Sequence, residues 1–309
     1  MPTHMNIAVM GAGAVGCYYG AMLARAGHAV VLVGRPAVVD AVAREGLLLE
    51  SPHFTGRVPL RADASPAAVK DAELVLFCVK SGDTESAGAA IAPYLSPHTS
   101  VLCLQNGVDN AARLSAGIRR QAIPVAVYVA VEMLGAARVR HHGRGDLSIG
   151  PSPASAAIAA LMTAAGLPSE VSEHVLDDLW AKLIINCAYN GLSAISQLPY
   201  GELVRQPHVL DTMRDVFDEC VTVARADGIT LPDTLWERLI GISVTMAGQR
   251  SSTAQDLSRG KKSEIEHLNG YVVRRGEELG VPAPVNRALL CAVQLLEAGR
   301  GQLRTDSLV

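Results

Sequence analysis

The chain has 309 residues, of which 49% are hydrophobic and 18% charged, and its formal net charge is −3. Such a chain is long enough for about two domains and apolar enough to bury a large core. The charge is weak and unclustered, which argues against nucleic acid as the main partner, because phosphate binding needs a concentrated basic face. No apolar run approaches the roughly 18–20 residues of a membrane span.

The first elements are predicted close together. Residues 6–10 form a short apolar run that ends in glycines, which is typical of a buried parallel strand. Residues 14–26 are rich in Ala and Leu and predict a helix, with Gly27 suited to its C-terminal cap. Residues 29–33 predict a second strand. A strand, a glycine turn, a helix and another strand within about 30 residues make a βαβ unit.

The alternation continues along the first half of the chain. Further strands are predicted at 74–79, 100–104 and 124–131, with a short edge strand at 146–150. Strands that alternate with helical segments indicate an α/β fold with a mostly parallel, doubly wound sheet of the Rossmann type. We therefore predict an N-terminal dinucleotide-binding domain over residues 1–173.

From about Ser172 onward the periodicity is helical and strand-like runs stop. We predict an all-helical C-terminal domain over residues 174–309, which would hold the substrate and the catalytic groups. Its helices are expected at 177–192, 207–227, 231–246, 263–279 and 284–299.

The segment after the first strand matches the G-x-G-x-x-G fingerprint of dinucleotide-binding proteins. In that motif the first glycine permits a tight turn, the second lets backbone approach a pyrophosphate, and the third allows close helix–strand packing. The helix that follows contributes free N–H groups and the positive end of its dipole. The strand and helix on either side make the match more specific than the glycines alone. The candidate cofactor-binding residues are Gly11, Ala12, Gly13, Ala14, Val15 and Gly16.

The end of the second predicted strand favours NADP(H) over NAD(H). NAD enzymes usually place an acidic side chain there for the ribose hydroxyls, whereas this chain has Arg35. A carboxylate would repel a 2′-phosphate and a guanidinium can pair with it. Asp40 lies too far along the chain to replace the acid. The alternative is that Arg35 is an ordinary solvated side chain.

Two polar residues follow the next two strands of the predicted sheet. Lys80 comes after the third strand and Asn106 after the fourth. Ligands of open α/β sheets bind outside the carboxyl ends of the strands, so Lys80 can hold a cofactor ribose or phosphate and Asn106 a ribose or a substrate oxygen. The alternatives are a solvated lysine and a simple Asn-Gly turn.

The helical domain carries a polar stripe. Lys182, Asn186 and Asn190 are spaced i, i+4 and i+8, which places them along one face of a helix among apolar neighbours. Buried amides and ammonium groups are costly without partners, so the stripe predicts a ligand site. A hydride that reaches a carbonyl carbon leaves negative charge on the oxygen, and a lysine can donate a proton there.

A second polar cluster lies at 251–270. Ser263 is suited to cap a helix, with Glu264 and Glu266 in its first turn, while the Ser252 hydroxyl is suited to a substrate carboxylate. The residue pattern leaves capping and catalysis both open. The histidines show no metal-ligand spacing, and the adjacent pair His141–His142 suits a turn better than a metal site, so no metal is expected.

Taken together, the motifs resemble those of the ketopantoate reductase (2-dehydropantoate 2-reductase) family, in order from Met5 to about Leu296. The resemblance implies a Rossmann domain followed by a helical domain, and NADPH-dependent reduction of a 2-oxo acid in pantothenate biosynthesis. The matching segments are GAGAVG at 11–16, CVK at 78–80, LQNG at 104–107, WAKLIINCAYN at 180–190, SSTAQDLSRGKKSEIEHLNG at 251–270 and GVPAPVNR at 280–287.

The resemblance also implies roles for individual residues. Lys182 looks like the proton donor, and Glu264 resembles a glutamate near the substrate hydroxyl and the cofactor. The remaining implied contacts are Asn186, Asn190 and Ser252 with the substrate, Lys80 with the cofactor, and Asn106 with the cofactor and the substrate.

Three positions depart from the family pattern. Tyr200 stands where an Asn often contacts the substrate, Thr253 where Met is common, and Gly191 where Pro is common. A phenol is larger than an amide and donates a single hydrogen bond. Tyr200 is therefore the position at which a different 2-oxo acid would be selected.

The expected partner is a small 2-oxo acid, without nucleic acid or membrane. The six cysteines form no CxxC pair and mostly lie in apolar runs, which is typical of thiols in a reducing compartment, and no signal peptide is recognised; both indicate a cytoplasmic protein. The apolar helices could form a homodimer interface or simply an intrachain core. The other functions considered are a related reductase of another 2-oxo acid and a non-catalytic NADP-binding sensor.

Overall fold

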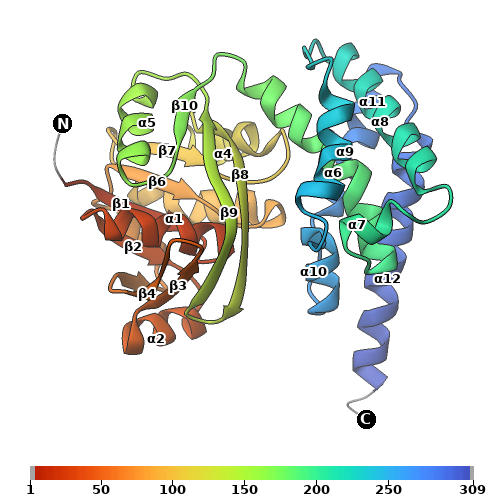
Figure 1. Ribbon diagram of the computed structural model, residues 1–309. Coiled ribbons are helices and arrows are strands. Elements are labelled where there is room, and N and C mark those ends of the chain that lie inside the picture. Colours follow the sequence, from red (N-terminus) through yellow and green to blue (C-terminus); the bar gives the residue numbers. More distant parts are fainter. Residues whose placement is uncertain (1–3, 307–309) are drawn as a thin grey trace. The chain divides into compact units, whose positions relative to one another are not determined.

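The computed structural model describes residues 4–306 and divides into two units, Met1–Leu176 and Asp177–Val309 (Figure 1). Unit 1 is an α/β unit and unit 2 is helical. The boundary that the sequence predicts, between residues 173 and 174, lies just before the division between the units. Among residues 4–306, no helix is long and apolar enough to cross a membrane.

Unit 1 is built on a single sheet in the strand order β4-β3-β9-β8-β7-β6-β1-β2-β5, with β10 paired to β9. The middle strands β2, β1, β6 and β7 run parallel, as does β5 at the edge. Their carboxyl ends therefore meet at one edge of the sheet. The strands are β1 (Asn6–Met10), β2 (Ala29–Val33), β3 (Leu47–Ser51), β4 (Phe54–Val58), β5 (Arg61–Asp63), β6 (Leu74–Phe77), β7 (Ser100–Cys103), β8 (Ile123–Gly135), β9 (Arg138–Ile149) and β10 (Ser169–Val171).

Apolar side chains cover both faces of this sheet. One core joins α1, α2 and α5 to β1, β2 and the β8–β9 region, and the other joins α3 and α4 to the opposite face. Helices on both faces confirm the doubly wound α/β fold. The helical segments of unit 1 are α1 (Ala14–Arg25), α2 (Pro36–Glu45), η1 (Pro66–Val69), η2 (Ser81–Asp83), α3 (Thr84–Ile91), η3 (Ala92–Tyr94), α4 (Asn110–Ile118) and α5 (Ser155–Ala164).

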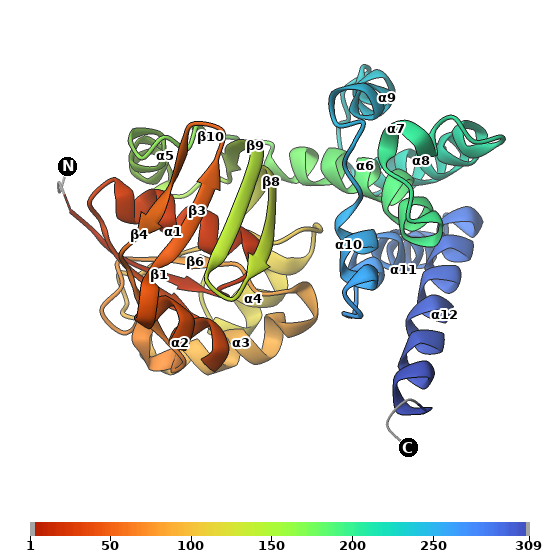
Figure 2. The same cartoon turned by 60° about the horizontal axis from the view of Figure 1, so that its bottom comes forward.

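The far side of the sheet departs from the prediction. β8 and β9 form a long antiparallel hairpin, and β3 and β4 form a second antiparallel pair (Figure 2). The predicted edge strand at 146–150 is only the end of β9. His141 and His142 lie within β9 and not in a turn: His141 stacks on Tyr18 with ring centroids 4.3 Å apart, and His142 Nε2 lies 2.9 Å from Glu132 Oε1.

Unit 2 contains helical segments alone among its described residues, as expected. Gly191 of α6 packs against α12, where an added Cβ would lie 3.1 Å from the Leu289 Cβ, so a larger residue there requires Leu289 to give way by a few tenths of an ångström. The segments are α6 (Val175–Ser196), α7 (Tyr200–Leu203), α8 (Val209–Ala226), α9 (Leu235–Thr245), α10 (Ser252–Ser258), η4 (Ile265–His267), α11 (Asn269–Leu279) and α12 (Pro284–Asp306).

Candidate functional site

The glycine turn lies between β1 and α1. Each of its three glycines is explained by a different physical constraint. Gly11 has φ +106°, and a Cβ there would lie 2.7 Å from the Val79 backbone N. A Cβ on Gly16 would lie 2.2 Å from the Gly11 carbonyl oxygen. By contrast, a Cβ on Gly13 would have no heavy atom within 4 Å. Two glycines therefore permit packing, and Gly13 leaves open space beside the start of α1.

That open space suits an anion. Gly13 is the N-cap residue of the twelve-residue α1 and has no side-chain cap, and the first turn carries no acidic residue. Ala14 and Val15 supply backbone N–H groups of that turn, while the Ala12 N–H donates to the Val33 carbonyl at 3.1 Å. Unpaired N–H groups and the positive end of a helix dipole favour a phosphate group. The residues of the turn therefore fit a dinucleotide pyrophosphate.

Arg35 lies at the carboxyl end of β2, where it is the N-cap residue of α2 and is exposed. Asp63, on the neighbouring strand β5, is in register with Val33. Its carboxylate accepts from Ser65 N at 3.0 Å and from Arg61 Nη2 at 2.9 Å. These bonds lower the pKa of Asp63, the backbone bond from Ser65 most and the Arg61 bond next. An acid therefore does lie at this edge, already engaged by Arg61, and the sequence pattern did not predict it.

Lys80 and Asn106 follow the adjacent parallel strands β6 and β7, in which Phe77 is in register with Cys103. They therefore lie at the same edge as the glycine turn, whose Gly11 approaches Val79. Buried side chains behind these two segments bind them together. Two further polar side chains, Gln105 and Asn110, lie at this edge, and the sequence pattern predicts no role for either.

The polar stripe of unit 2 lies on α6 as predicted, and all three residues belong to this one helix. Lys182 and Asn186 are partly buried, and Asn190 is 2% exposed. Among the described residues, nothing hydrogen-bonds the Asn190 Nδ2. An unsatisfied buried amide costs about 1–3 kcal/mol. Asn190 therefore has the property expected of a side chain that pairs with a ligand.

The end of α6 is joined to the start of α10. Ser251 N donates to Ser193 Oγ at 3.2 Å, and Ser251 Oγ lies 3.4 Å from the Asn190 carbonyl oxygen. Ser251 also caps α10 by accepting from Ala254 N at 3.0 Å. These bonds hold the exposed Ser252, the first residue of α10, next to the Asn190 turn of α6.

Tyr200 joins the same region, because its backbone N–H donates to the Gln249 carbonyl at 2.9 Å, just before Ser251. Its ring packs against that of Tyr189, with centroids 4.7 Å apart and planes at 54°. Burial, and next the neighbouring Tyr189, raise the pKa of Tyr200, so its phenol stays protonated. Tyr189 is itself fixed by a 3.0 Å bond from its hydroxyl to the Leu239 carbonyl.

Glu264 is 9% exposed and comes directly before the short turn η4. The prediction that Ser263 begins a long helix is wrong: its Oγ accepts from Ile265 N at 3.3 Å and opens only this turn, while α11 begins at Asn269. Ser263 is therefore a cap, but of one turn. Thr253, which follows Ser252 in α10, is 1% exposed, and its hydroxyl has no partner among the described residues.

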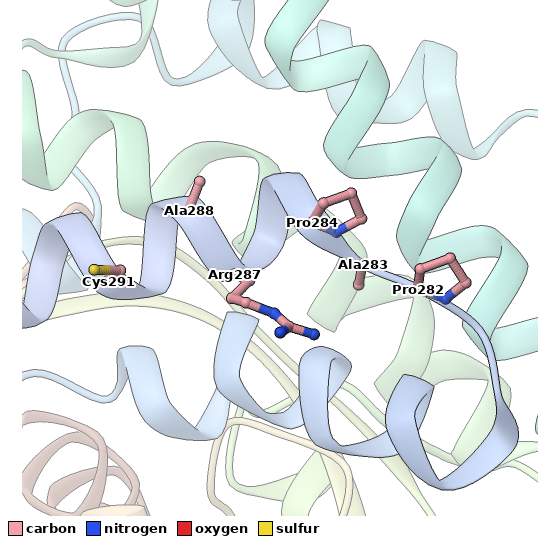
Figure 3. A pocket seen from close by; sticks show the side chains of 6 residues that line it. All are labelled: Pro282, Ala283, Pro284, Arg287, Ala288 and Cys291. Atoms are coloured by element: carbon pink, nitrogen blue, oxygen red, sulfur yellow. The ribbon is translucent and has the colours of Figure 1, made fainter.

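A shallow depression of about 520 Å³ lies elsewhere in unit 2, on the first turns of α12 (Figure 3). It contains none of the candidate residues, and Cys291 within it is exposed, although most of the cysteines lie in apolar runs. The lining residues are Pro282, Ala283, Pro284, Arg287, Ala288 and Cys291.

The structure thus gathers most of the candidates into one group in each unit. The group in unit 1 contains the glycine turn, Lys80 and Asn106. The group in unit 2 contains Asn190, Ser252 and Tyr200, with Asn186 and Lys182 one and two turns earlier on α6.

Comparison with known proteins identifies a family that spans both units. Residues 7–154 match the family described as ketopantoate reductase PanE/ApbA, and residues 174–297 match its C-terminal domain. The chain belongs to the ketopantoate reductase family. It is therefore an oxidoreductase, and the resemblance predicted from its motifs is confirmed.

Individual members of the family match nearly the whole chain. A 2-dehydropantoate 2-reductase of Halobacterium salinarum is 33% identical over 305 residues, covering 95% of this chain and 99% of that protein. The crystal structure of a PanE/ApbA family ketopantoate reductase from Ralstonia eutropha JMP134 is 55% identical, with a TM-score of 0.94, covering 96% of this chain and 100% of that one. Both matches include the two domains.

A more distant solved structure shares the fold. D-mandelate dehydrogenase with NADH and anilino(oxo)acetate has a TM-score of 0.90 at 23% identity, covering 96% of this chain and 100% of that chain. At this identity the likeness extends to the fold alone. The same fold therefore also occurs in a protein that is named D-mandelate dehydrogenase.

Proposed function

We propose that the chain reduces 2-dehydropantoate to pantoate with NADPH, as a step of pantothenate biosynthesis. The observation that carries the proposal is the buried, unpaired amide of Asn190 on the same helix face as Lys182. A reductase of a 2-oxo acid needs polar groups that orient the acid and a proton donor beside them. The named relatives support the choice of 2-dehydropantoate.

NADPH supplies the hydride when it is bound. The backbone of Gly11–Gly16 receives its pyrophosphate, with open space at Gly13. Arg35 pairs with the 2′-phosphate, which a carboxylate at that position would repel. Lys80, Asn106 and Glu264 complete the proposed cofactor contacts.

The side chains of unit 2 act on the acid. Asn186, Asn190 and Ser252 bind and orient it through hydrogen bonds. Lys182 donates a proton from its Nζ to the ketone oxygen as negative charge develops there, and Glu264 acts close to the hydroxyl that forms. Asn106 provides an additional contact with the substrate.

A second candidate is the reduction of a different 2-oxo acid by the same residues. Tyr200 favours it, because none of the described residues hydrogen-bonds its hydroxyl and its ring packs on Tyr189. A phenol and an aromatic ring select a different substrate side chain from that selected by a primary amide.

We also place the reaction in the cytoplasm. All six cysteines are free thiols. Burial raises the pKa of Cys17 and Cys103 to about 12, which keeps both protonated and unreactive. Free thiols, four of them buried, fit a reducing compartment.

Steady-state rates with a panel of 2-oxo acids, each measured with NADPH and NADH, test the proposal. We expect the highest kcat/KM with 2-dehydropantoate and NADPH. A higher value with another 2-oxo acid would support the second candidate, and tight NADPH binding without oxidation by any 2-oxo acid would contradict the reductase itself.

A further inference from the structure

Buried polar side chains fill the space behind Lys80 and Asn106 in unit 1. Thr84 is 0% exposed, Asn110 2% and Gln105 5%. Buried polar groups are costly unless they are hydrogen-bonded, so a cluster of them at one edge of a sheet requires an explanation.

Gln105 connects the end of β7 to the end of β6. Its Nε2 donates to the Val79 carbonyl at 3.0 Å and to Thr84 Oγ1 at 2.8 Å. Its Oε1 accepts from Cys103 Sγ at 3.1 Å. Both amide donors are therefore engaged, and one of them holds the residue directly before Lys80.

Asn110 makes the complementary connection. Its Nδ2 donates to the Asn106 carbonyl at 2.5 Å and to Ser81 Oγ at 3.1 Å. The Ser81 hydroxyl in turn lies 3.3 Å from the same Asn106 carbonyl. This side chain therefore holds the backbone of Asn106 and the residue directly after Lys80.

Arg113 determines which way the Asn110 amide faces. Its Nη1 donates to Asn110 Oδ1 at 3.0 Å, and because a guanidinium is only a donor, the amide nitrogen must face Asn106. Arg113 is held by a two-pronged pair with Glu85 at 2.7 and 2.8 Å, and this bond raises the pKa of Arg113. It also donates to the Ser81 carbonyl at 2.9 Å.

We propose that Gln105 and Asn110 are positioning residues, which act through Lys80 and Asn106 by fixing the spacing of the two segments that carry them. Residues 79 and 81 are held on either side of Lys80, and the backbone of Asn106 is held at its carbonyl. This inference rests on the proposed function for the roles of Lys80 and Asn106. The geometry of the network itself belongs wholly to unit 1.

The amino-terminal ends of the same two strands, β6 and β7, provide the matched control. Thr99 lies just before β7, and its buried hydroxyl donates to the Ala72 carbonyl, just before β6, at 2.7 Å. It connects the same two strands at their amino ends. Thr99→Val therefore removes a buried hydrogen bond of similar kind, far along the strands from Lys80 and Asn106.

Double-mutant cycles separate positioning from stability. In the first cycle, Gln105→Met and Asn110→Asp are each combined with Asn106→Ala, and kcat is measured. In the second, the affinity cycle, each is combined with Lys80→Ala, and the Kd of NADPH is measured by protein fluorescence. Asn110→Asp keeps the acceptor for Arg113 and loses both donors, so it supplies a second variant should Gln105→Met fail to fold.

We expect each single variant to lower kcat or weaken NADPH binding about 10- to 100-fold, since small misplacements of reacting groups have effects of this size. The loss should nearly vanish when Asn106 or Lys80 is already Ala, because interacting residues are not additive. Thr99→Val should lower Tm without changing kcat or Kd.

Additive losses in both cycles, or an equal loss of kcat in Thr99→Val, would overturn the positioning role. The affinity cycle needs no substrate, so it decides the inference even if wild-type protein reduces no 2-oxo acid. A wild-type protein that reduces no 2-oxo acid would contradict the proposed function and would leave the positioning role of Gln105 and Asn110 unaffected.

Discussion

The glycine turn of unit 1 and the polar stripe of α6 differ in how they can bind a ligand. At Gly13 a Cβ would meet nothing within 4 Å, so the turn offers backbone N–H groups that no side chain covers. At Asn190 a buried side chain offers an amide without a partner. As proposed, the first region would bind a ligand in the space that a missing side chain leaves, and the second through a side chain that is present. Adding atoms should therefore damage one, and removing them the other.

The two regions should also differ in what they cost the fold. Gly11 and Gly16 are required for packing, since a Cβ at either would lie within 3 Å of backbone atoms. Asn190 gives the fold an unsatisfied buried group. With the proposed roles, function and stability coincide at Gly11 and Gly16 and oppose each other at Asn190.

The largest effect is expected at Lys182. Lys182→Met should lower kcat about 10²- to 10⁴-fold, because positioned proton transfer contributes about that much. NADPH affinity should change far less. Lys262→Met, at an exposed lysine of the same unit, serves as the control and should leave kcat unchanged. Near-wild-type turnover of Lys182→Met would exclude the proton-donor role.

At Asn190, the sign of the change in stability on substitution distinguishes a ligand contact from a packing residue. Asn190→Leu should lower kcat/KM about 100-fold, while the free energy of unfolding stays level or rises by about 1 kcal/mol, because an unsatisfied amide is removed. The measurements are steady-state kinetics and denaturant unfolding. A clear loss of stability would indicate that the amide is already satisfied in the free enzyme, for instance by buried water.

Gly13 tests the backbone half of the comparison. Gly13→Val should raise the Kd of NADPH about 30-fold, or about 2 kcal/mol, by filling the space that the pyrophosphate needs. Gly241→Val is the control, since a Cβ there also meets nothing within 4 Å and the position lies in α9. If both variants bind NADPH like wild type, the turn does not hold the pyrophosphate.

A smaller effect is expected at Arg35, which we propose pairs with a single phosphate group of the cofactor. Arg35→Ala should weaken NADPH binding about tenfold and leave NADH binding unchanged, because a charged hydrogen bond at an exposed residue contributes about 1.5 kcal/mol. Arg44→Ala, at an exposed arginine of the same helix α2, is the matched control. Equal losses for both cofactors at Arg35 would show that it does not distinguish them.

The parts of this comparison that the sequence could predict are local. A glycine turn between a strand and a helix, and polar residues every fourth position of a helix, are patterns within a short segment. Arg61 and Asp63 form a strand too short to predict, and the antiparallel β9 begins in a charged, glycine-containing segment without strand-like alternation. Local composition therefore placed the centre of the sheet and not its edges.

The hydrogen bonds that hold the candidate residues in place join segments far apart in the sequence. They could therefore not be predicted from it. The amide of Gln105 is bonded to Val79 across 26 positions, and Ser251 to Asn190 across 61. No spacing rule connects such residues, because their proximity is created by strand order and helix packing. The sequence identified candidate contacts of the ligand and missed the residues that hold them.

The smallest effect is expected at Tyr200, where the choice of acid should change more than the rate of reduction. Tyr200→Asn should shift the ratio of kcat/KM between 2-dehydropantoate and an apolar 2-oxo acid about tenfold toward 2-dehydropantoate, a difference of about 1.4 kcal/mol. Tyr200→Phe removes only the hydroxyl and keeps the ring on Tyr189. If Phe reproduces the wild-type ratio and Asn shifts it, the ring selects the acid; if Phe shifts it as much, the hydroxyl does. An unchanged ratio in both variants would remove Tyr200 from substrate selection.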